Sequence, residues 1–129
     1  MTRVIICGSR NFKDKELLYA NVTDVLSKEE NIDDEIEIVT GGCRGADEIG
    51  KQYAIEHGYK HTEVPADWSK YGKKAGYIRN KEMAEYASKT NAICIAFPVG
   101  ESKGTRMMMK LAHEHNIEVI YGRINNSST

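Results

Sequence analysis

Short apolar segments alternate with amphipathic segments along the whole chain, and this alternation restricts the fold more than any other feature. Five apolar runs predict β-strands, at residues 3–7, 35–40, 59–64, 92–97 and 117–121. Four segments with apolar residues at helical spacing predict helices, at residues 14–30, 46–57, 77–88 and 105–115. Strands separated by helices favour a parallel sheet that is covered on both faces. We therefore expect an α/β fold: a single Rossmann-like domain with a doubly wound, mainly parallel sheet of about five strands and helices on both faces.

Length and composition agree with one soluble domain. The chain has 129 residues, of which 40% are hydrophobic, so a core of ordinary size can form. We expect the domain over residues 1–123 and a disordered polar tail over residues 124–129. No apolar run approaches the roughly 20 residues of a membrane span, and the start lacks a signal-peptide pattern. A cytoplasmic location without a membrane partner is the expectation.

Charge and cysteine usage narrow the classes of partner. The 18 basic residues balance 19 acidic ones, so the composition argues against nucleic acid as the partner. The cysteines, Cys7, Cys43 and Cys94, are widely spaced and form no CxxC pair. Neither a disulfide framework nor a zinc site is indicated, and the histidine pairs lack further ligands at metal-binding spacing. We expect no metal and no cofactor.

Polar or glycine-rich loops follow four of the predicted strands, at residues 8–12, 41–47, 65–76 and 98–105. In an open α/β sheet, ligands bind beyond the carboxyl ends of the strands, where such loops meet. One loop of this kind is an ordinary turn, whereas four together are better explained by a binding site.

The loop after the second predicted strand suits an anion. Gly41, Gly42 and Gly45 allow the backbone to approach a ligand, and the next helix presents free N–H groups at its start. Arg44 can add a charge-assisted contact. The alternative is a tight turn in which Asp47 only caps its helix. The spacing is not GxGxxG, so a dinucleotide-binding fingerprint is not indicated.

The loop after the fourth predicted strand repeats this pattern. Ser102, Gly104 and Thr105 stand at the start of a helix, where hydroxyl and amide groups can hold an anion. An ordinary N-cap by Ser102 or Thr105 is the alternative. Because two such helix starts share one edge of the sheet, a ligand site is the preferred interpretation.

The segment from Trp68 to Asn80 places aromatic side chains beside lysines and Arg79. Such a combination suits a nucleobase and its phosphates, through stacking and charge. The alternative is a surface loop in which Trp68 packs on the core and the lysines face solvent. We predict that Trp68 and Arg79 contact the ligand or support its site.

Four stretches carry a resemblance to a known family: CGSRNF, TGGCRGAD, VPADWSKYGKKAGYIRNKEM and FPVGESKGTRMMMKLA. Together they resemble the YspA-like branch of the SLOG superfamily, over about residues 4–119. That superfamily also contains the lonely-guy phosphoribohydrolases, the DNA-processing protein A family and ligand-sensing domains of prokaryotic defence systems. The resemblance implies a Rossmann-like fold that binds a nucleotide or a nucleotide-derived compound, in a prokaryotic or phage protein.

The resemblance also implies site residues at matching positions. These are Gly8, Ser9, Arg10, Gly41, Gly42, Gly45, Asp47, Arg79, Asn80, Ser102, Gly104 and Thr105. One departure concerns the chemistry. The phosphoribohydrolases carry glutamates shortly after Gly-Thr, one of them catalytic, whereas residues 106–108 here are Arg-Met-Met.

Two functions therefore remain open, and a third is less favoured. The first is a sensor, carrier or sequestering protein for a nucleotide-derived small molecule. The second is a hydrolase of N-glycosidic bonds in a nucleoside phosphate or an ADP-ribose-like compound, with Asp67 and Glu101 as candidate carboxylates for an oxocarbenium-like transition state. The third is single-stranded DNA binding, against which the net charge of −1 argues. A homodimer is a further expectation from the superfamily.

Overall fold

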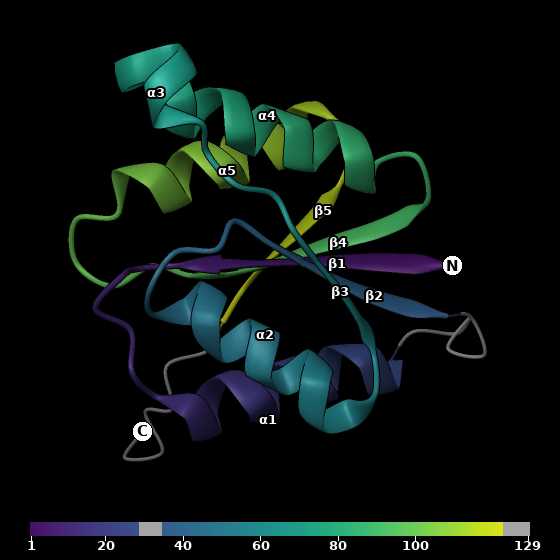
Figure 1. The fold of residues 1–129 in the computed structure, drawn as a ribbon. Helices are drawn as coiled ribbons and strands as arrows, with labels where there is room; N and C mark the ends of the chain where they lie inside the picture. Colours follow the sequence, from purple (N-terminus) through teal and green to yellow (C-terminus); the bar gives the residue numbers. More distant parts are fainter. Residues whose placement is uncertain (29–34, 123–129) are drawn as a thin grey trace.

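The computed structural model describes residues 1–28 and 35–122, which form a five-stranded parallel sheet with helices on both faces (Figure 1). The strands are β1 (Thr2–Gly8), β2 (Ile36–Thr40), β3 (Lys60–Glu63), β4 (Asn91–Phe97) and β5 (Glu118–Tyr121). The helices are α1 (Lys15–Lys28), α2 (Ala46–His57), α3 (Trp68–Tyr71), the 3₁₀ turn η1 (Gly72–Lys74), α4 (Ala75–Ala87) and α5 (Lys103–Glu114). The expected single α/β domain with a Rossmann-like arrangement is confirmed.

The strand order β3-β2-β1-β4-β5 shows how the chain is wound. From β1 it proceeds outward to β2 and β3, then crosses back to β4 and continues to β5. Helices α1 and α2 cover one face of the sheet, and α3, α4 and α5 lie on the other (Figure 1). The winding direction changes between β1 and β4, and a crevice opens beyond the carboxyl ends of the strands at such a point. β1 occupies the middle of the sheet, and the very apolar β4 lies beside it as an internal strand between β1 and β5.

The core consists of two layers separated by the sheet. Alternate residues of β1 point to opposite faces, as the twofold period of a strand requires. Val4 and Ile6 pack with α1 and α2, whereas Ile5 and Cys7 pack with α4 and α5. Because both faces are covered, β1 is apolar throughout its centre, which is the pattern expected of a buried parallel strand.

The main departure from the predicted elements lies between β3 and α4. The segment expected as a loop contains α3 and η1, and α4 begins at Ala75, two residues before the predicted start at Tyr77. The Asp67 carboxylate caps α3 by accepting the backbone N–H of Lys70, at 3.1 Å from Oδ1. Gly72, with φ +57°, follows as the last turn of α3 ends. The predicted tail at 124–129 lies outside the described residues.

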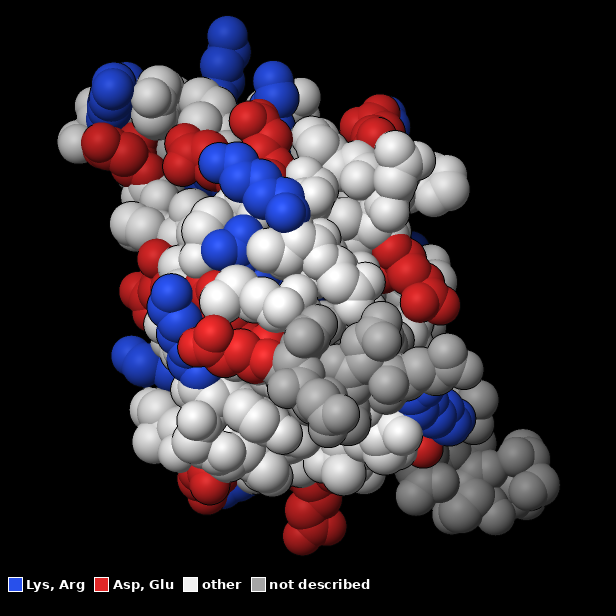
Figure 2. Space-filling model, turned by 90° about the vertical axis from the view of Figure 1, so that its right-hand side faces the viewer, with Lys and Arg blue, Asp and Glu red and all other residues white. Residues whose placement is uncertain are grey.

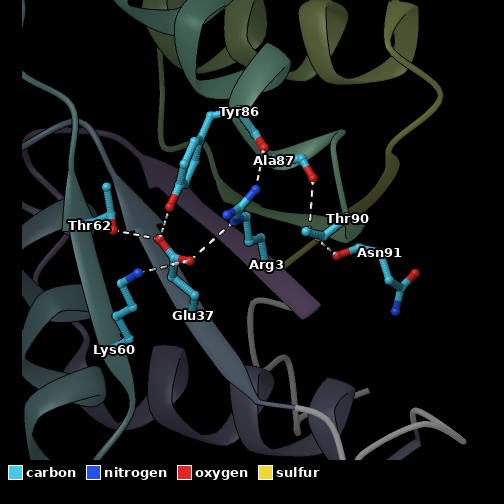
Figure 3. Close-up of polar contacts among 8 residues, drawn as sticks. All are labelled: Arg3, Glu37, Lys60, Thr62, Tyr86, Ala87, Thr90 and Asn91. Carbon is cyan, nitrogen blue, oxygen red and sulfur yellow. Dashed lines mark hydrogen bonds and ion pairs between the residues drawn. The ribbon is translucent and has the colours of Figure 1, made fainter. Parts of the chain in front are cut away.

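A buried carboxylate links three strands to α4 at the end of the sheet where the strands begin (Figure 3). The Glu37 side chain is fully buried and accepts hydrogen bonds from Thr62 and Tyr86. The Arg3 Nε atom lies 3.1 Å from its Oε1, and the Lys60 Nζ atom lies 3.9 Å away. Burial by itself raises the pKa of Glu37, but the hydrogen bonds from Thr62, Tyr86 and Arg3 outweigh burial and hold the pKa below its ordinary value. The buried charge is thus fully paired.

The surface at this end of the molecule carries a mixture of charges. Figure 2 shows basic and acidic side chains interspersed over it, without a wide area of one sign. Among the helices within residues 1–28 and 35–122, none is both long and apolar enough to span a bilayer. The same part of the chain contains no group of three or more His, Cys, Asp or Glu that could hold a metal ion.

Candidate functional site

A cleft of about 410 Å³ lies beyond the carboxyl ends of β1 and β2, between the loops that follow them and the helices α4 and α5. This is the edge at which the polar loops were expected to meet. Most of the predicted site residues line it: Gly8, Ser9, Arg10, Gly41, Arg44, Asp47, Arg79, Asn80, Glu101, Ser102, Gly104 and Thr105.

Four predicted site residues do not line the cleft. Asp67 caps α3, and Trp68 begins that helix with 54% of its surface exposed. Gly42 and Gly45 have φ values of +74° and +80°, which an L-residue rarely adopts, and both act in the turn that leads into α2. For Asp67 the structure therefore shows a helix-capping role and no place in the cleft wall.

The rest of the cleft lining consists of residues that were not predicted to bind a ligand: Cys7, Asn11, Cys43, Met83, Lys103 and Met108. Both methionines are also buried in the packing of α4 and α5 against the sheet. A signal for them exists, because Met83 and Met108 stand three residues after Asn80 and Thr105, on the same face of α4 and α5. A helix face that places one residue in the cleft also places the residue one turn later against the cleft.

Asp47 connects the loop after β2 to α2. Its side chain is buried, and Oδ2 accepts the backbone N–H groups of Gly41 (3.0 Å) and Cys43 (3.3 Å). It therefore holds the preceding loop and does not simply cap its own helix. Burial raises the pKa of Asp47 to about 6, against the lowering effect of these two hydrogen bonds and of the Arg79 charge.

Arg79 and Asn80, in the second turn of α4, connect the loop after β2 to the first turn of α5. Arg79 donates from Nη1 to the Gly41 carbonyl (2.7 Å) and from Nε to the Asn80 Oδ1 atom (2.8 Å). Asn80 in turn donates from Nδ2 to the Gly104 carbonyl, at 3.3 Å. The loop after β2 and the first turn of α5 are therefore held at a set separation across the cleft by two adjacent residues of α4.

The first turn of α5 presents unsatisfied donors to the cleft. Ser102 stands at the N-cap position, but its hydroxyl bonds to the backbone N–H and carbonyl of Val99 and does not cap the helix. The first N–H groups of a helix have no partner within it. Thr105 lines the cleft, and its hydroxyl is open to it and has no hydrogen-bond partner in the described part of the chain. A ligand oxygen would satisfy these groups.

Cations outnumber carboxylates around the cleft. Arg10, Arg44 and Lys103 line it, and within residues 1–28 and 35–122 none of these three side chains has an ion-pair or hydrogen-bond partner. Arg79 adds a fourth positive charge, against the carboxylates of Asp47 and Glu101. The arrangement suits an anionic ligand, because charge-assisted bonds to guanidinium groups are strong.

A model of the YspA, cpYpsA-related SLOG family matches residues 2–71, which is more than half of the chain. This chain belongs to that family. The resemblance inferred from the motifs is thereby confirmed. This SLOG protein is similar to the Gene 61 protein of Mycobacterium phage D29, with 38% identity over 125 residues that cover 93% of this chain and 95% of the phage protein.

Solved structures of low sequence identity share the SLOG fold of this chain. DNA processing protein A (DprA) from Streptococcus pneumoniae superposes with a TM-score of 0.66 at 14% identity, over 97% of this chain. The chain spans about half of DprA, 52% of its length. The structural genomics target TM1055 superposes with a TM-score of 0.62 at 15% identity, over 92% of this chain and 72% of that protein. These likenesses show the fold alone.

The buried carboxylate of Asp47 makes stability depend on pH. Its pKa is raised from 3.8 to about 6, so the folded state binds more protons than the unfolded state between these values. Stability must therefore fall as pH rises through that window, by about 3 kcal/mol in total, and then stay level. Asp47→Asn removes this titration. We expect the stability of the wild type relative to Asp47→Asn to fall by that amount between about pH 4 and 7, in urea denaturation series. Other carboxylates titrate in both proteins and cancel, so a constant difference would contradict the assignment.

Proposed function

We propose that the cleft binds a nucleotide or a nucleotide-derived small molecule through its phosphate, and that the protein acts as a sensor, carrier or sequestering protein. The observation that carries this proposal is a set of donors that face the cleft without a partner among the described residues: the Thr105 hydroxyl and the side chains of Arg10, Arg44 and Lys103. An anionic ligand that replaces water in the cleft would meet several hydrogen-bond donors at once, three of them charged.

The surroundings of Thr105 favour phosphate as the hydrogen-bond partner of its hydroxyl. The unpaired N–H groups of the first turn of α5 and the positive end of the helix dipole suit a negative charge. Lys103 and Arg10 line the same cleft and add positive charge without a competing ion pair in the described ranges. Phosphate offers several acceptor oxygens, so it can use hydroxyl, backbone and guanidinium donors together.

The volume and lining of the cleft also suit the nucleoside part. About 410 Å³ is within the range of small-molecule sites, which combine apolar walls with a few directed polar groups. Met83, Met108 and Cys7 supply apolar surface on the floor of the cleft. The Asp47 and Glu101 carboxylates are available as acceptors for hydroxyl or amino groups.

A hydroxyl-deletion experiment tests the phosphate contact. We expect Thr105→Val to weaken AMP binding by roughly 10-fold or more, since a bond to a charged group is lost without a change of shape. Adenosine, which lacks the phosphate, should bind more weakly than AMP and should respond little to this change. Isothermal titration calorimetry measures both ligands against both proteins.

Thr105→Ser is the matched control, because it keeps the hydroxyl and should keep most of the AMP affinity. The exposed Lys89, which lies on the turn after α4 and does not line the cleft, offers a second control as Lys89→Ala. If AMP, IMP, NAD and ADP-ribose all fail to bind, or if Thr105→Val binds AMP as the wild type does, the proposal is wrong.

Glu101 favours a second candidate function, hydrolysis of an N-glycosidic bond. It is exposed, lines the cleft, and has no partner in the described part of the chain. Here a carboxylate stabilises the sugar cation while water adds to the anomeric carbon, and the base departs with a proton. If the protein is such an enzyme, Glu101→Gln should lose turnover of a nucleoside phosphate or ADP-ribose by about 100-fold while it keeps its affinity. Liquid chromatography with mass spectrometry detects the free base.

A further inference from the structure

A second hollow adjoins the cleft on the side of α2. It has a volume of about 420 Å³ and lies between the loop that leaves β1 and the first turn of α2. It shares Arg10, Asn11 and Arg44 with the cleft, so these residues form a ridge between the two spaces. In Figure 1 the loop after β1 passes beside the start of α2, and the Ala46 N–H donates to the Ser9 carbonyl at 3.4 Å.

We propose that the ligand has two ring-bearing parts joined by a diphosphate, with one part in the cleft, the diphosphate over the ridge, and the other part in the second hollow. This inference rests on the proposed function and specifies the class of ligand. The ligand is a nucleotide in which a second phosphate joins the first phosphate to a second polar ring.

The ridge has the charge that a diphosphate requires. Arg10 and Arg44 are both exposed, and neither side chain has an ion-pair or hydrogen-bond partner within the described ranges. Two neighbouring guanidinium groups repel each other, and an anion between them removes that repulsion. Lys13, which lines the second hollow, adds a third positive charge beside them.

Beside Glu48, the second hollow does not suit a phosphate. Glu48 lines it, is exposed and has no partner among the described residues, so it would repel an anion placed there. Phe12 and Ile49 supply apolar surface, and Asn11 adds an amide. An uncharged ring with hydroxyl groups matches this lining, because Glu48 and Asn11 can accept or donate hydrogen bonds to it.

The test compares a one-part with a two-part ligand in the wild type and in a variant whose second hollow is filled. We expect ADP-ribose to bind at least about 10-fold more tightly than AMP by calorimetry, since the ridge and the second hollow add contacts. In Glu48→Trp the bulky ring occupies the second hollow, and ADP-ribose should then bind no more tightly than AMP. AMP affinity should stay within about twofold of the wild type, because the cleft is intact.

Glu85→Trp is the matched control. It makes the same exchange at an exposed helical position, on α4 at the other face of the sheet, and should leave both affinities unchanged. If AMP binds but ADP-ribose binds no more tightly, or if Glu48→Trp keeps the advantage of ADP-ribose, the two-part ligand is ruled out while the proposed function stands. If neither compound binds, the two-part ligand is overturned, and the proposed function falls with it when IMP and NAD also fail to bind.

Discussion

Replacing Gly45 by alanine should be among the most damaging single changes in this chain, with an expected loss of stability of about 3 kcal/mol or more. Gly45 has φ +80° and ψ −126°, a conformation that only glycine adopts readily. A Cβ atom there would lie 2.3 Å from the Ser9 carbonyl oxygen, which belongs to the backbone and cannot move alone. The melting temperature should fall by roughly 10 °C in thermal denaturation followed by circular dichroism.

Glycine to alanine at the start of α5, which also borders the cleft, provides the control. Gly104 lies in the first turn of α5, and nothing stands within 4 Å of the place where its Cβ would be. Gly104→Ala should therefore leave stability unchanged or raise it by about 0.5 kcal/mol, through the lower entropy of the unfolded chain. An equal loss in both variants would mean that alanine acts through something other than the contact at Gly45.

Replacing Glu37 by alanine should cost about 3–5 kcal/mol, because it removes one partner of a buried ion pair and leaves the other. The Arg3 side chain is 13% exposed and would keep its bond to the Tyr86 carbonyl and its place over the Tyr86 ring, but lose its counter-charge. The hydroxyls of Thr62 and Tyr86 would lose their acceptor as well (Figure 3). Urea denaturation at neutral pH measures the loss.

Lys60→Ala is the matched control for this network. Lys60 Nζ lies 3.9 Å from the Glu37 carboxylate, but its side chain is 54% exposed, so water solvates the charge. Its removal should cost no more than about 1 kcal/mol. If Glu37→Ala costs as little as Lys60→Ala, the network does not hold α4 against the sheet.

Glu37 and Asp47 should respond to pH in opposite directions. The pKa of Glu37 is lowered, so its stabilising effect is present above the ordinary pKa of a glutamate and is lost as pH falls through the lowered value. The pKa of Asp47 is raised, so its ionisation destabilises the fold as pH rises toward about 6. The two carboxylates differ because three hydrogen-bond donors meet Glu37 on side chains, whereas burial dominates at Asp47.

The sequence by itself determined the class of fold and most of the element bounds, because these depend on local patterns. Helix α2 runs from Ala46 to His57 as predicted, since Gly58 ends it in the left-handed conformation (φ +70°). The continuous apolar run of β1 indicated a strand of a parallel sheet that is covered on both faces. The convergence of three loops at one edge also followed, because parallel strands all end on the same side.

Only the tertiary structure decided which loops share the cleft. The loop after β3 was expected there, but β3 is an edge strand in the order β3-β2-β1-β4-β5, and Asp67 does not line the cleft. Arg79 arrives by another route, from α4 across the face of the sheet to the Gly41 carbonyl. Likewise, only the structure shows that Arg10 and Arg44, which lie 34 positions apart, form one ridge. Strand order and contacts between side chains distant in sequence depend on how all the helices pack together. Local sequence patterns do not specify this packing.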